Sequence, residues 1–271
     1  MRVFGTIAPI VATLMLSAER PAPAPLPVVG KWQLDYSPTT CRLLASFGPD
    51  RDTVEISQAD PRGKLRLSIV SRAMPPTNVV RRVAVWFDNP NHALLLQSAA
   101  LPPVAGSRVL HMAEAEGLLE ALKARGATGE PVVMSLSWAG HARSYQLGKT
   151  SSLLNALDGC MDDLVTSWGY DAAEQRAAMP PKPVTEPRSW VTDLDFPQAL
   201  VRAGKTAGLN LRLQIDATGN VAGCQAQEIG GAKEFDELTC RLVRERGHYT
   251  PATAKDGRPI PSYVFLRADW R

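Results

Sequence analysis

Short stretches in which apolar and polar side chains alternate recur through the first two-thirds of the chain. In residues 65–69, for example, three aliphatic residues alternate with Arg66 and Ser68. A period of two places successive side chains on opposite faces of a strand, which is typical of a sheet with one buried and one solvated face. The strands predicted in this part of the chain cover residues 31–35, 53–57, 64–71, 81–87, 93–98, 131–138 and 143–147.

Two further stretches carry apolar residues at the helical spacing of three and four positions. The first, residues 114–125, has Leu118, Leu119 and Leu122 on one face. The second, residues 151–167, has a longer stripe made of Leu153, Leu154, Leu157, Met161, Leu164 and Val165. Together with the strands, these helices predict an α+β domain over residues 30–176 with a mainly antiparallel sheet. Its residues match no family pattern, so its role stays open.

The last third of the chain has a different order of elements. A short helical stretch at 198–203 precedes an alternating strand at 209–216, a turn at 217–220 and a second strand at 221–227. Gly219 can supply the positive φ that the hairpin corner requires. A helix is predicted at 234–246 and a final strand at 262–270. The apolar stripe of this helix, which can cover the hairpin, consists of Phe235, Leu238, Leu242 and Val243.

Two proline-rich stretches separate these parts. Residues 19–29 form a Pro/Ala tether. Residues 177–189 contain four prolines among polar residues, a density that excludes a helix or an interior strand. We therefore predict a linker there, followed by a small domain over residues 190–271. The four prolines are Pro180, Pro181, Pro183 and Pro187.

Residues 1–18 combine one early positive charge with a short apolar run and small residues near its end. This pattern is typical of a secretory signal peptide. Since crossing a bilayer takes about 20 apolar residues and this run contains Pro9, a membrane span is disfavoured. An uncleaved inner-membrane anchor is the alternative to a cleaved signal. Either way, we expect the chain to be exported.

An exported chain folds where disulfides form. Its four cysteines allow three pairings, and two of them fall in each half of the chain. Pairing within each half is the simplest arrangement, which predicts Cys41–Cys160 and Cys224–Cys240. A metal site is disfavoured, because the sequence has no CxxC motif and no histidine at ligand spacing.

The composition and the remaining motifs give little evidence for a chemical function. A formal charge of +3 from 30 basic and 27 acidic residues gives no reason to expect a nucleic-acid partner. His92, His111, His141 and His248 are isolated, and Gly148-Lys149-Thr150 lacks the first glycine of a phosphate-binding loop, since position 143 is arginine. The sequence therefore predicts no catalytic residue, no metal and no cofactor.

The order of signals in the last third resembles the C-terminal domain of the TonB family, the periplasmic part of energy transducers that engage outer-membrane receptors. The residues that carry the resemblance are Phe196, Pro197, Gly208, Gly219, Asp236, Pro251 and Gly257. The apolar run at the start of the chain lacks the histidine of a transducer's membrane helix, and a folded domain replaces the family's long proline-rich rod. The resemblance therefore covers the binding end of a transducer.

The resemblance implies that the last strand lies at a sheet edge and captures an extended peptide of a receptor by strand addition. The residues expected to form this partner-binding edge are Tyr263, Val264, Phe265, Leu266 and Arg267. We accordingly expect a non-enzymatic periplasmic protein whose partner is an outer-membrane receptor or another envelope protein. A homodimer through the same edge is a further arrangement that the sequence allows.

Two other functions stay open at this point. One is a module that binds peptidoglycan through exposed tryptophans, the candidates being Trp32, Trp168, Trp190 and Trp270. The other is an enzyme with its site in the first domain, where His141 lies near Ser137. Serine hydrolases assemble their triads in space, so the sequence alone does not decide this.

Overall fold

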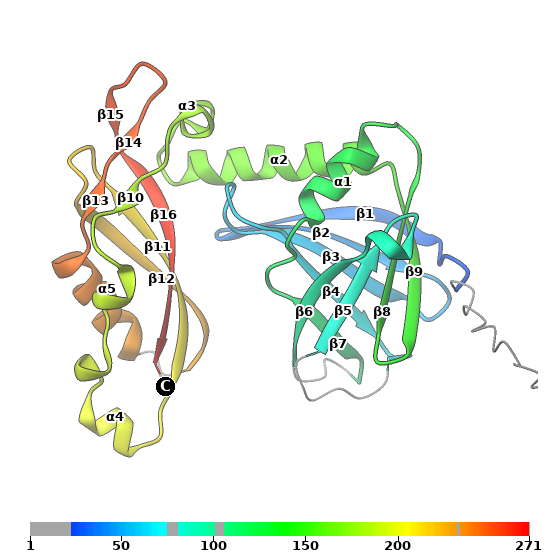
Figure 1. The fold of residues 1–271 in the computed structure, drawn as a ribbon, viewed down its shortest axis with the longest axis horizontal. Coiled ribbons are helices and arrows are strands. Elements are labelled where there is room, and N and C mark those ends of the chain that lie inside the picture. The colour runs from blue at the N-terminus through cyan, green and yellow to red at the C-terminus, as the bar shows by residue number, and fades with distance from the viewer. Residues whose placement is uncertain (1–22, 75–80, 101–105, 232–233, 271) are drawn as a thin grey trace, which may run out of the picture.

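The computed structural model describes residues 23–74, 81–100, 106–231 and 234–270 (Figure 1). They form two lobes, each with its own hydrophobic core. We call residues 23–170, which include Trp168 packed on the first core, the N-terminal lobe, and residues 190–270 the C-terminal lobe. The predicted signal peptide, residues 1–18, lies outside the described residues. Within them, no helix is both long and apolar enough to span a membrane.

The N-terminal lobe is built on one nine-stranded sheet in the order β1-β2-β3-β4-β7-β6-β5-β8-β9. Every neighbouring pair in it is antiparallel, as the alternating pattern predicted. The strands are β1 (Val28–Ser37), β2 (Thr40–Phe47), β3 (Asp52–Gln58), β4 (Arg66–Ser71), β5 (Arg81–Trp86), β6 (Leu94–Ala100), β7 (Arg108–Met112), β8 (Val132–Trp138) and β9 (His141–Gly148).

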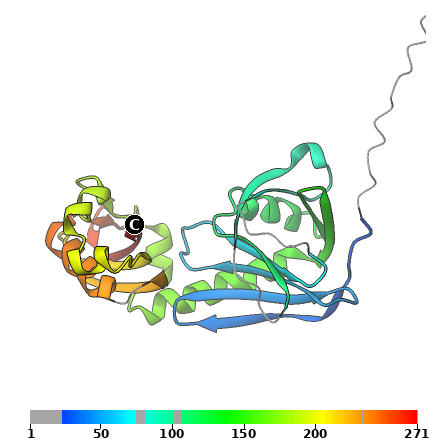
Figure 2. The same ribbon diagram turned by 90° about the horizontal axis from the view of Figure 1, so that it is seen from below.

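The sheet curls until its two outer strands meet. Leu26, just before β1, donates its N–H to Ser144 on β9 at 2.8 Å and accepts from Gln146 at 2.9 Å. Trp32 on β1 adds an indole bond to the carbonyl of Leu147 at 3.0 Å. Pairing of this kind leaves few unpaired backbone groups at the sheet edges. Figure 2 shows the strands wrapped around the lobe's interior.

Two helices pack on this sheet. α2 (Thr150–Ser167) follows the predicted stripe and buries its apolar side chains. α1 (Leu118–Gly126) begins four residues later than predicted. The reason is Gly117, whose φ of +74° is left-handed and cannot continue a helix. α2 leads from the N-terminal lobe towards the C-terminal lobe, where the chain turns into α3 (Ala172–Ala177) (Figure 1).

The C-terminal lobe contains a three-stranded antiparallel sheet covered on one face by a helix. The strand order is β12-β11-β16, with β11 (Ala207–Ile215), β12 (Val221–Gly231) and β16 (Ser262–Trp270). The helix is α5 (Glu234–Arg246), which has the predicted bounds and buries Phe235, Leu242 and Val243 against the sheet. A short helix, α4 (Gln198–Arg202), precedes β11.

The proline-rich segment predicted as a linker lies along the C-terminal lobe. It contains β10 (Lys182–Pro183), which pairs with β13 (Tyr249–Thr250), and a 3-10 turn, η2 (Pro187–Ser189). The N–H of Val184 also donates to the carbonyl of His248 at 2.8 Å. Only short pieces pair, because proline removes the donors that a longer strand would need. These backbone bonds therefore fasten the proline-rich segment to the C-terminal lobe.

The remaining elements complete the C-terminal lobe. A second small ribbon joins β14 (Ala252–Thr253) to β15 (Pro259–Ile260). Another 3-10 turn, η3 (Asp193–Asp195), begins the lobe at a capping box formed by Thr192 and Asp195. A third 3-10 turn, η1 (Pro90–His92), lies in the N-terminal lobe between β5 and β6.

Candidate functional site

β16 is an edge strand. Since β11 lies between β12 and β16, β16 pairs with another strand along one of its two edges only. In the described part of the chain no strand covers its second edge, which we call the outer edge. An uncovered edge presents a row of backbone donors and acceptors to an incoming strand. β16 lies on the side of its lobe that faces the N-terminal lobe (Figure 1).

The hydrogen-bonding pattern fixes which residues of β16 face this outer edge. The N–H of Asp216, just past β11, donates to Asn220 in the turn to β12. Backbone groups alternate in direction along a strand, so the odd-numbered residues of β11 point to β16 instead. Ile215 pairs with Ser262 and Leu211 with Leu266. The even-numbered residues of β16 therefore bond to β11, and the odd-numbered ones point outward.

The five residues predicted as the partner-binding edge divide accordingly. Val264 and Leu266 bond to β11 and pack on the core beneath α5. Tyr263, Phe265 and Arg267 direct their backbone groups outward and their side chains to the sheet face opposite α5. On that face Tyr263 is buried at 1% exposure, Phe265 is half-buried and Arg267 is exposed.

The N-terminal lobe covers part of this face with aromatic side chains from the end of α2. The ring of Trp168 lies 5.1 Å from that of Tyr263 and 5.9 Å from that of Phe265. Tyr170 lies 5.5 Å from Tyr263 on its other side. The Trp168–Tyr263 pair is edge-on and the other two are tilted. Aromatic pairs at these separations are favourable beyond the area they bury. The lobes are thus held together by an aromatic cluster centred on Tyr263.

Three side chains outside the C-terminal lobe also occupy backbone acceptors at the start of β16. Gln175 donates to the carbonyl of Pro261 at 2.9 Å, and Tyr170 donates to Ser262 at 2.9 Å. Arg62 donates to the carbonyl of Tyr263 at 2.7 Å and stacks 4.4 Å over its ring. Of these carbonyls, those of the odd-numbered Pro261 and Tyr263 point to the outer edge. An added strand would need these acceptors, so the outer edge is capped at this end.

Arg212 on β11 lies under the same cluster and is only 7% exposed. Its guanidinium is 4.3 Å from the ring of Trp168 and donates to the side chain of Gln225. Its Nη1 has no hydrogen-bond partner among the described residues. Burial lowers the pKa of Arg212, although arginine stays charged at neutral pH. The contact between the lobes therefore buries a cation that is stabilised by a ring rather than by an anion.

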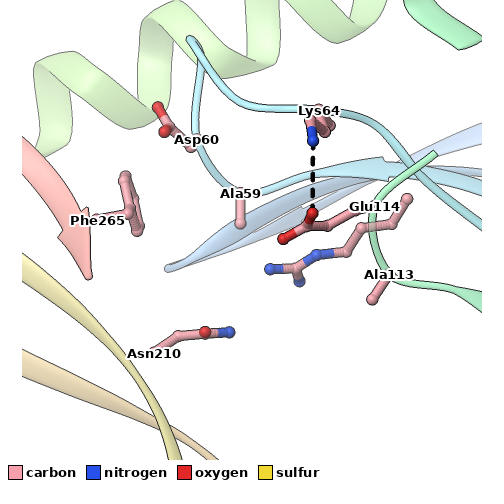
Figure 3. Close-up of a pocket in the computed structure, with 8 residues that line it drawn as sticks. Ala59, Asp60, Lys64, Ala113, Glu114, Asn210 and Phe265 are labelled. Carbon is pink, nitrogen blue, oxygen red and sulfur yellow. Dashed lines mark hydrogen bonds and ion pairs between the residues drawn. The ribbon is translucent and has the colours of Figure 1, made fainter. Parts of the chain in front are cut away.

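Beyond the capped end, a cleft of about 590 Å³ separates β16 from the N-terminal lobe. The C-terminal wall consists of Asn210, Phe265, Leu266 and Arg267. A second hollow of about 260 Å³ adjoins it and shares Phe265 and Asn210. Figure 3 shows these two residues across an open space from the N-terminal wall of the second hollow, where Ala59, Asp60, Lys64, Ala113 and Glu114 are labelled.

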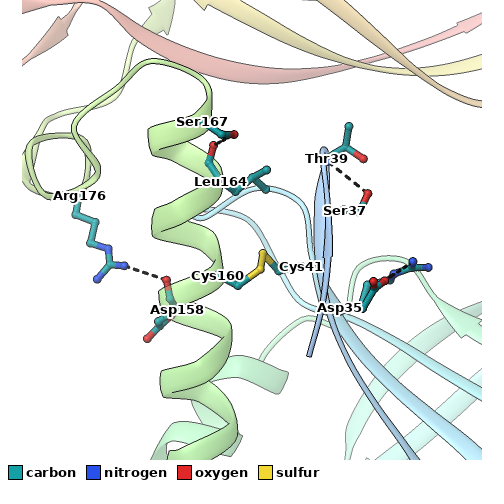
Figure 4. The surroundings of a disulfide bond; sticks show 10 residues. Asp35, Ser37, Thr39, Cys41, Asp158, Cys160, Leu164, Ser167 and Arg176 are labelled. Atoms are coloured by element: carbon teal, nitrogen blue, oxygen red, sulfur yellow. Dashed lines mark hydrogen bonds and ion pairs between the residues drawn. A yellow bond between two sulfur atoms is a disulfide. The ribbon is translucent and has the colours of Figure 1, made fainter. Parts of the chain in front are cut away.

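Both predicted cysteine pairs are brought together. Cys41 on β2 and Cys160 on α2 are disulfide-bonded with Cα atoms 6.0 Å apart, which fastens the helix to the sheet (Figure 4). Cys224 on β12 and Cys240 on α5 are bonded with Cα atoms 5.5 Å apart. Each lobe thus has one disulfide, placed between its helix and its sheet.

The residues that carry the family resemblance have structural roles in the C-terminal lobe. Phe196 packs edge-on against Phe235 and Trp270, each at 5.4 Å. Gly219 has a φ of +91°, and a Cβ there would lie 1.9 Å from the carbonyl oxygen of Tyr249. Turn and helix-end positions explain most of the others. Pro197 precedes α4, Asp236 lies in the first turn of α5, Pro251 lies between β13 and β14, and Gly257 turns with a φ of +87°, whereas Gly208 lies within β11.

The side chains considered for catalysis do not come together as a site. His141 is exposed and lies beside Trp138, with ring centroids 6.1 Å apart. The buried hydroxyl oxygens of Ser135 and Ser144 lie 2.8 Å apart, and Ser137 is not part of this pair. His111 contacts Ser68 at 2.9 Å, and burial lowers its pKa. No group of three or more metal-ligating side chains occurs in the described ranges.

The tryptophans considered as a sugar-binding platform are in packed positions. Trp190 and Trp270 are buried in the C-terminal core. Trp32 packs on Phe47, and Trp168 joins the two lobes. The sequence offered no signal for the interlobe role of Trp168, because its aromatic partners Tyr263 and Phe265 lie almost a hundred residues later in the chain.

Comparison with known proteins supports the family assignment for one part of the chain. Residues 192–271 match the family model described as "Gram-negative bacterial TonB protein C-terminal". This segment, which includes β11, β12, α5 and β16, is therefore a TonB C-terminal domain, as the resemblance predicted. The N-terminal lobe and the residues that cap β16 lie outside the match. Comparisons with curated proteins and with solved structures find no match.

Proposed function

We propose that this protein is a non-enzymatic periplasmic protein that captures an extended segment of an envelope protein by strand addition to the outer edge of β16. The observation that carries the proposal is the uncovered backbone of Phe265 and Arg267 in a segment that matches the TonB C-terminal family. Domains of this family interact with outer-membrane proteins generally. An outer-membrane receptor is therefore the first partner to test.

Strand addition needs little from side chains, since backbone hydrogen bonds supply most of the affinity. This agrees with the composition of the outer edge beyond its capped end, where the residues that point outward are Phe265, Arg267 and Asp269, an aromatic and two charged residues. The capped carbonyls of Pro261 and Tyr263 leave the stretch from 264 onward for pairing. A partner segment of about seven residues fits that length.

The domain arrangement belongs to the same proposal. We infer an exported chain with a tether at 19–29, whose last residues join the sheet from Leu26 onward. An N-terminal domain at 30–176, a proline-rich segment at 177–189 and the binding domain at 190–271 follow it. The two disulfides are consistent with an oxidising compartment. In this arrangement the N-terminal domain accompanies the binding domain as a fixed neighbour, through the aromatic cluster around Tyr263.

The proposal is tested with the full exported chain, in its oxidised form, as bait for a solubilised envelope fraction. The informative variant is Arg267→Pro, which removes one outward N–H, and its matched control is Arg267→Ala, which removes the side chain but keeps the N–H. We expect the wild type and Arg267→Ala to retain outer-membrane proteins and Arg267→Pro to lose them.

Equal recovery by the two variants would contradict strand addition. Retention on purified cell wall instead of proteins would favour the peptidoglycan-binding alternative. A second copy of this chain as the occupant would appear as a dimer by light scattering, and it would dissociate in the Arg267→Pro variant.

A further inference from the structure

The cleft beside β16 has a wall that the TonB C-terminal match does not include. On the N-terminal side it is lined by Thr39, Thr40, Arg66, His111, Ala113 and Glu114. A strand added to the outer edge of β16 would send every second side chain towards one face of the sheet. The face opposite α5 is the one that the cleft adjoins, because Asn210, Phe265 and Arg267 share it.

Arg66 is the charged residue of this wall that lacks a partner. No hydrogen bond or ion pair joins its guanidinium to another residue in the described part of the chain, and it lines both hollows. The other cations at the cleft are already paired. Lys64 contacts Glu114, at 3.5 Å, and Glu116, and Arg267 contacts Asp269 at 3.0 Å.

The surroundings of Arg66 make it a strong site for an anion. It is half-buried, and desolvation lowers its pKa, with only a longer-range attraction from Glu55 opposing this. Its charge also helps to lower the pKa of His111, together with burial. A guanidinium that has lost water without gaining an acceptor is stabilised by any carboxylate that reaches it, and arginine binds carboxylates with two parallel bonds.

Two anions could compete for Arg66. Glu55 attracts Arg66 without forming an ion pair with it among the described residues, and its carboxylate accepts from the hydroxyl of Ser57 at 3.0 Å. The second anion is Glu114. Its carboxylate is engaged by Lys64, as the dashed line in Figure 3 shows. Asp60 lines only the smaller hollow and accepts from the backbone N–H of Arg62 at 2.9 Å. The larger hollow is lined by two positively charged residues, Arg66 and Arg267, and one negatively charged residue, Glu114, so its lining has a net charge of +1.

We propose that the N-terminal lobe contributes to the specificity for the partner. In this proposal Arg66 selects an extended segment that carries an aspartate or glutamate on its cleft-facing side. This inference rests on the proposed strand addition to β16 and adds a specificity determinant from the other lobe. Phe265 and Arg267 flank the cleft, so the acidic residue lies opposite residues 265–267. The capped carbonyls of Pro261 and Tyr263 fix the end of the paired stretch and thereby its register.

The test uses a library of seven-residue segments, fully randomised and displayed on phage, selected on the full oxidised chain. The selection is repeated with Arg66→Gln, with Arg66→Lys and with Arg188→Gln. Arg188 is a matched control because its side chain is 87% exposed and lies outside the cleft lining. Thermal unfolding of each variant checks that the fold is kept.

We expect the wild type and Arg188→Gln to enrich Asp or Glu at one fixed position, with partial enrichment by Arg66→Lys and none by Arg66→Gln. For a selected peptide, replacing this acidic residue by its amide should weaken binding to the wild type about tenfold. The same replacement should leave binding to Arg66→Gln unchanged.

Two results would overturn the role of Arg66: no acidic enrichment by the wild type, or the same enrichment by Arg66→Gln. A different result would overturn strand addition itself. If selected segments bind Arg267→Pro as tightly as Arg267→Ala, or if no segment is selected by any variant, the outer edge of β16 is not the site, and the inference falls with it.

Discussion

Replacing Trp168 by alanine is expected to release the two lobes from each other. Trp168 stacks on Arg212 and makes an edge-on contact with Tyr263 and a tilted contact with Phe265. A cation–π contact contributes roughly 0.5–2 kcal/mol and each aromatic pair about 0.5–1.5 kcal/mol. Because Trp168 is only partly buried, we take a total of about 2–3 kcal/mol from the lower part of that range. This corresponds to a shift of about 30- to 150-fold in the equilibrium between joined and separated lobes.

Pulsed electron paramagnetic resonance between one spin label in each lobe measures this shift. Cysteines introduced at the exposed positions Arg82 and Arg188 would be the only thiols to react, since all four native cysteines are in disulfides. We expect one narrow distance distribution for the doubly labelled parent protein and a broad, longer distribution for Trp168→Ala. The matched control is Trp32→Ala, which removes a partly buried ring that packs on Phe47 inside the N-terminal lobe.

The control variant should keep the narrow distribution even though it loses stability. If Trp168→Ala also keeps it, the aromatic cluster does not hold the lobes together. A broad distribution in the parent protein would lead to the same conclusion.

Two further predictions concern stability. In the chain-entropy model, removing the Cys41–Cys160 disulfide, whose residues are 119 apart, lowers the free energy of unfolding by about 5 kcal/mol. Removing Cys224–Cys240, whose residues are 16 apart, lowers it by about 3 kcal/mol. Urea unfolding of the two double Cys→Ala variants measures both losses, and a larger loss for Cys224–Cys240 would contradict this prediction. Hydrogen bonds from Arg246, with help from Thr192, hold the pKa of Asp195 well below its usual range. Its stabilisation is therefore present above the unfolded-state pKa near 3.9 and is lost as pH falls below it, so the melting temperatures of wild type and Asp195→Asn should converge in acid; a gap independent of pH would refute this.

The C-terminal lobe could be predicted from local signals to a large extent. α5 and β16 have the predicted bounds, because an amphipathic stripe and a period-two pattern each fix one buried face. The turn at Gly219 was predictable for a similar reason, since the required φ is positive.

The N-terminal lobe was predicted less completely. The strands β2 and β7 were missed, although β2 buries every second side chain, including Cys41 and Phe47. Its polar positions are few, so the alternation is weak when read as sequence alone. β7 has only five residues, a length at which short apolar runs are ambiguous.

The contact between the lobes was not predictable from the sequence pattern. Asn210, Arg212 and Gln214 alternate with leucines and therefore indicate a solvated face. The structure instead buries Arg212 beneath Trp168. An aromatic ring can cover a guanidinium without an ion pair. Because this ring comes from the other lobe, the local sequence around Arg212 does not indicate that Arg212 is buried. The role of Arg66 in the cleft depends on the same juxtaposition.

The central claim is that a partner strand pairs with the outer edge of β16. It is tested most directly by amide hydrogen exchange, followed by NMR, of the full chain with and without a segment recovered in the pull-down. We predict that the amides of Phe265 and Arg267 become protected on binding, whereas those of Val264 and Leu266, already bonded to β11, change little. Unchanged exchange at Phe265 and Arg267, with protection elsewhere on the chain, would contradict the account.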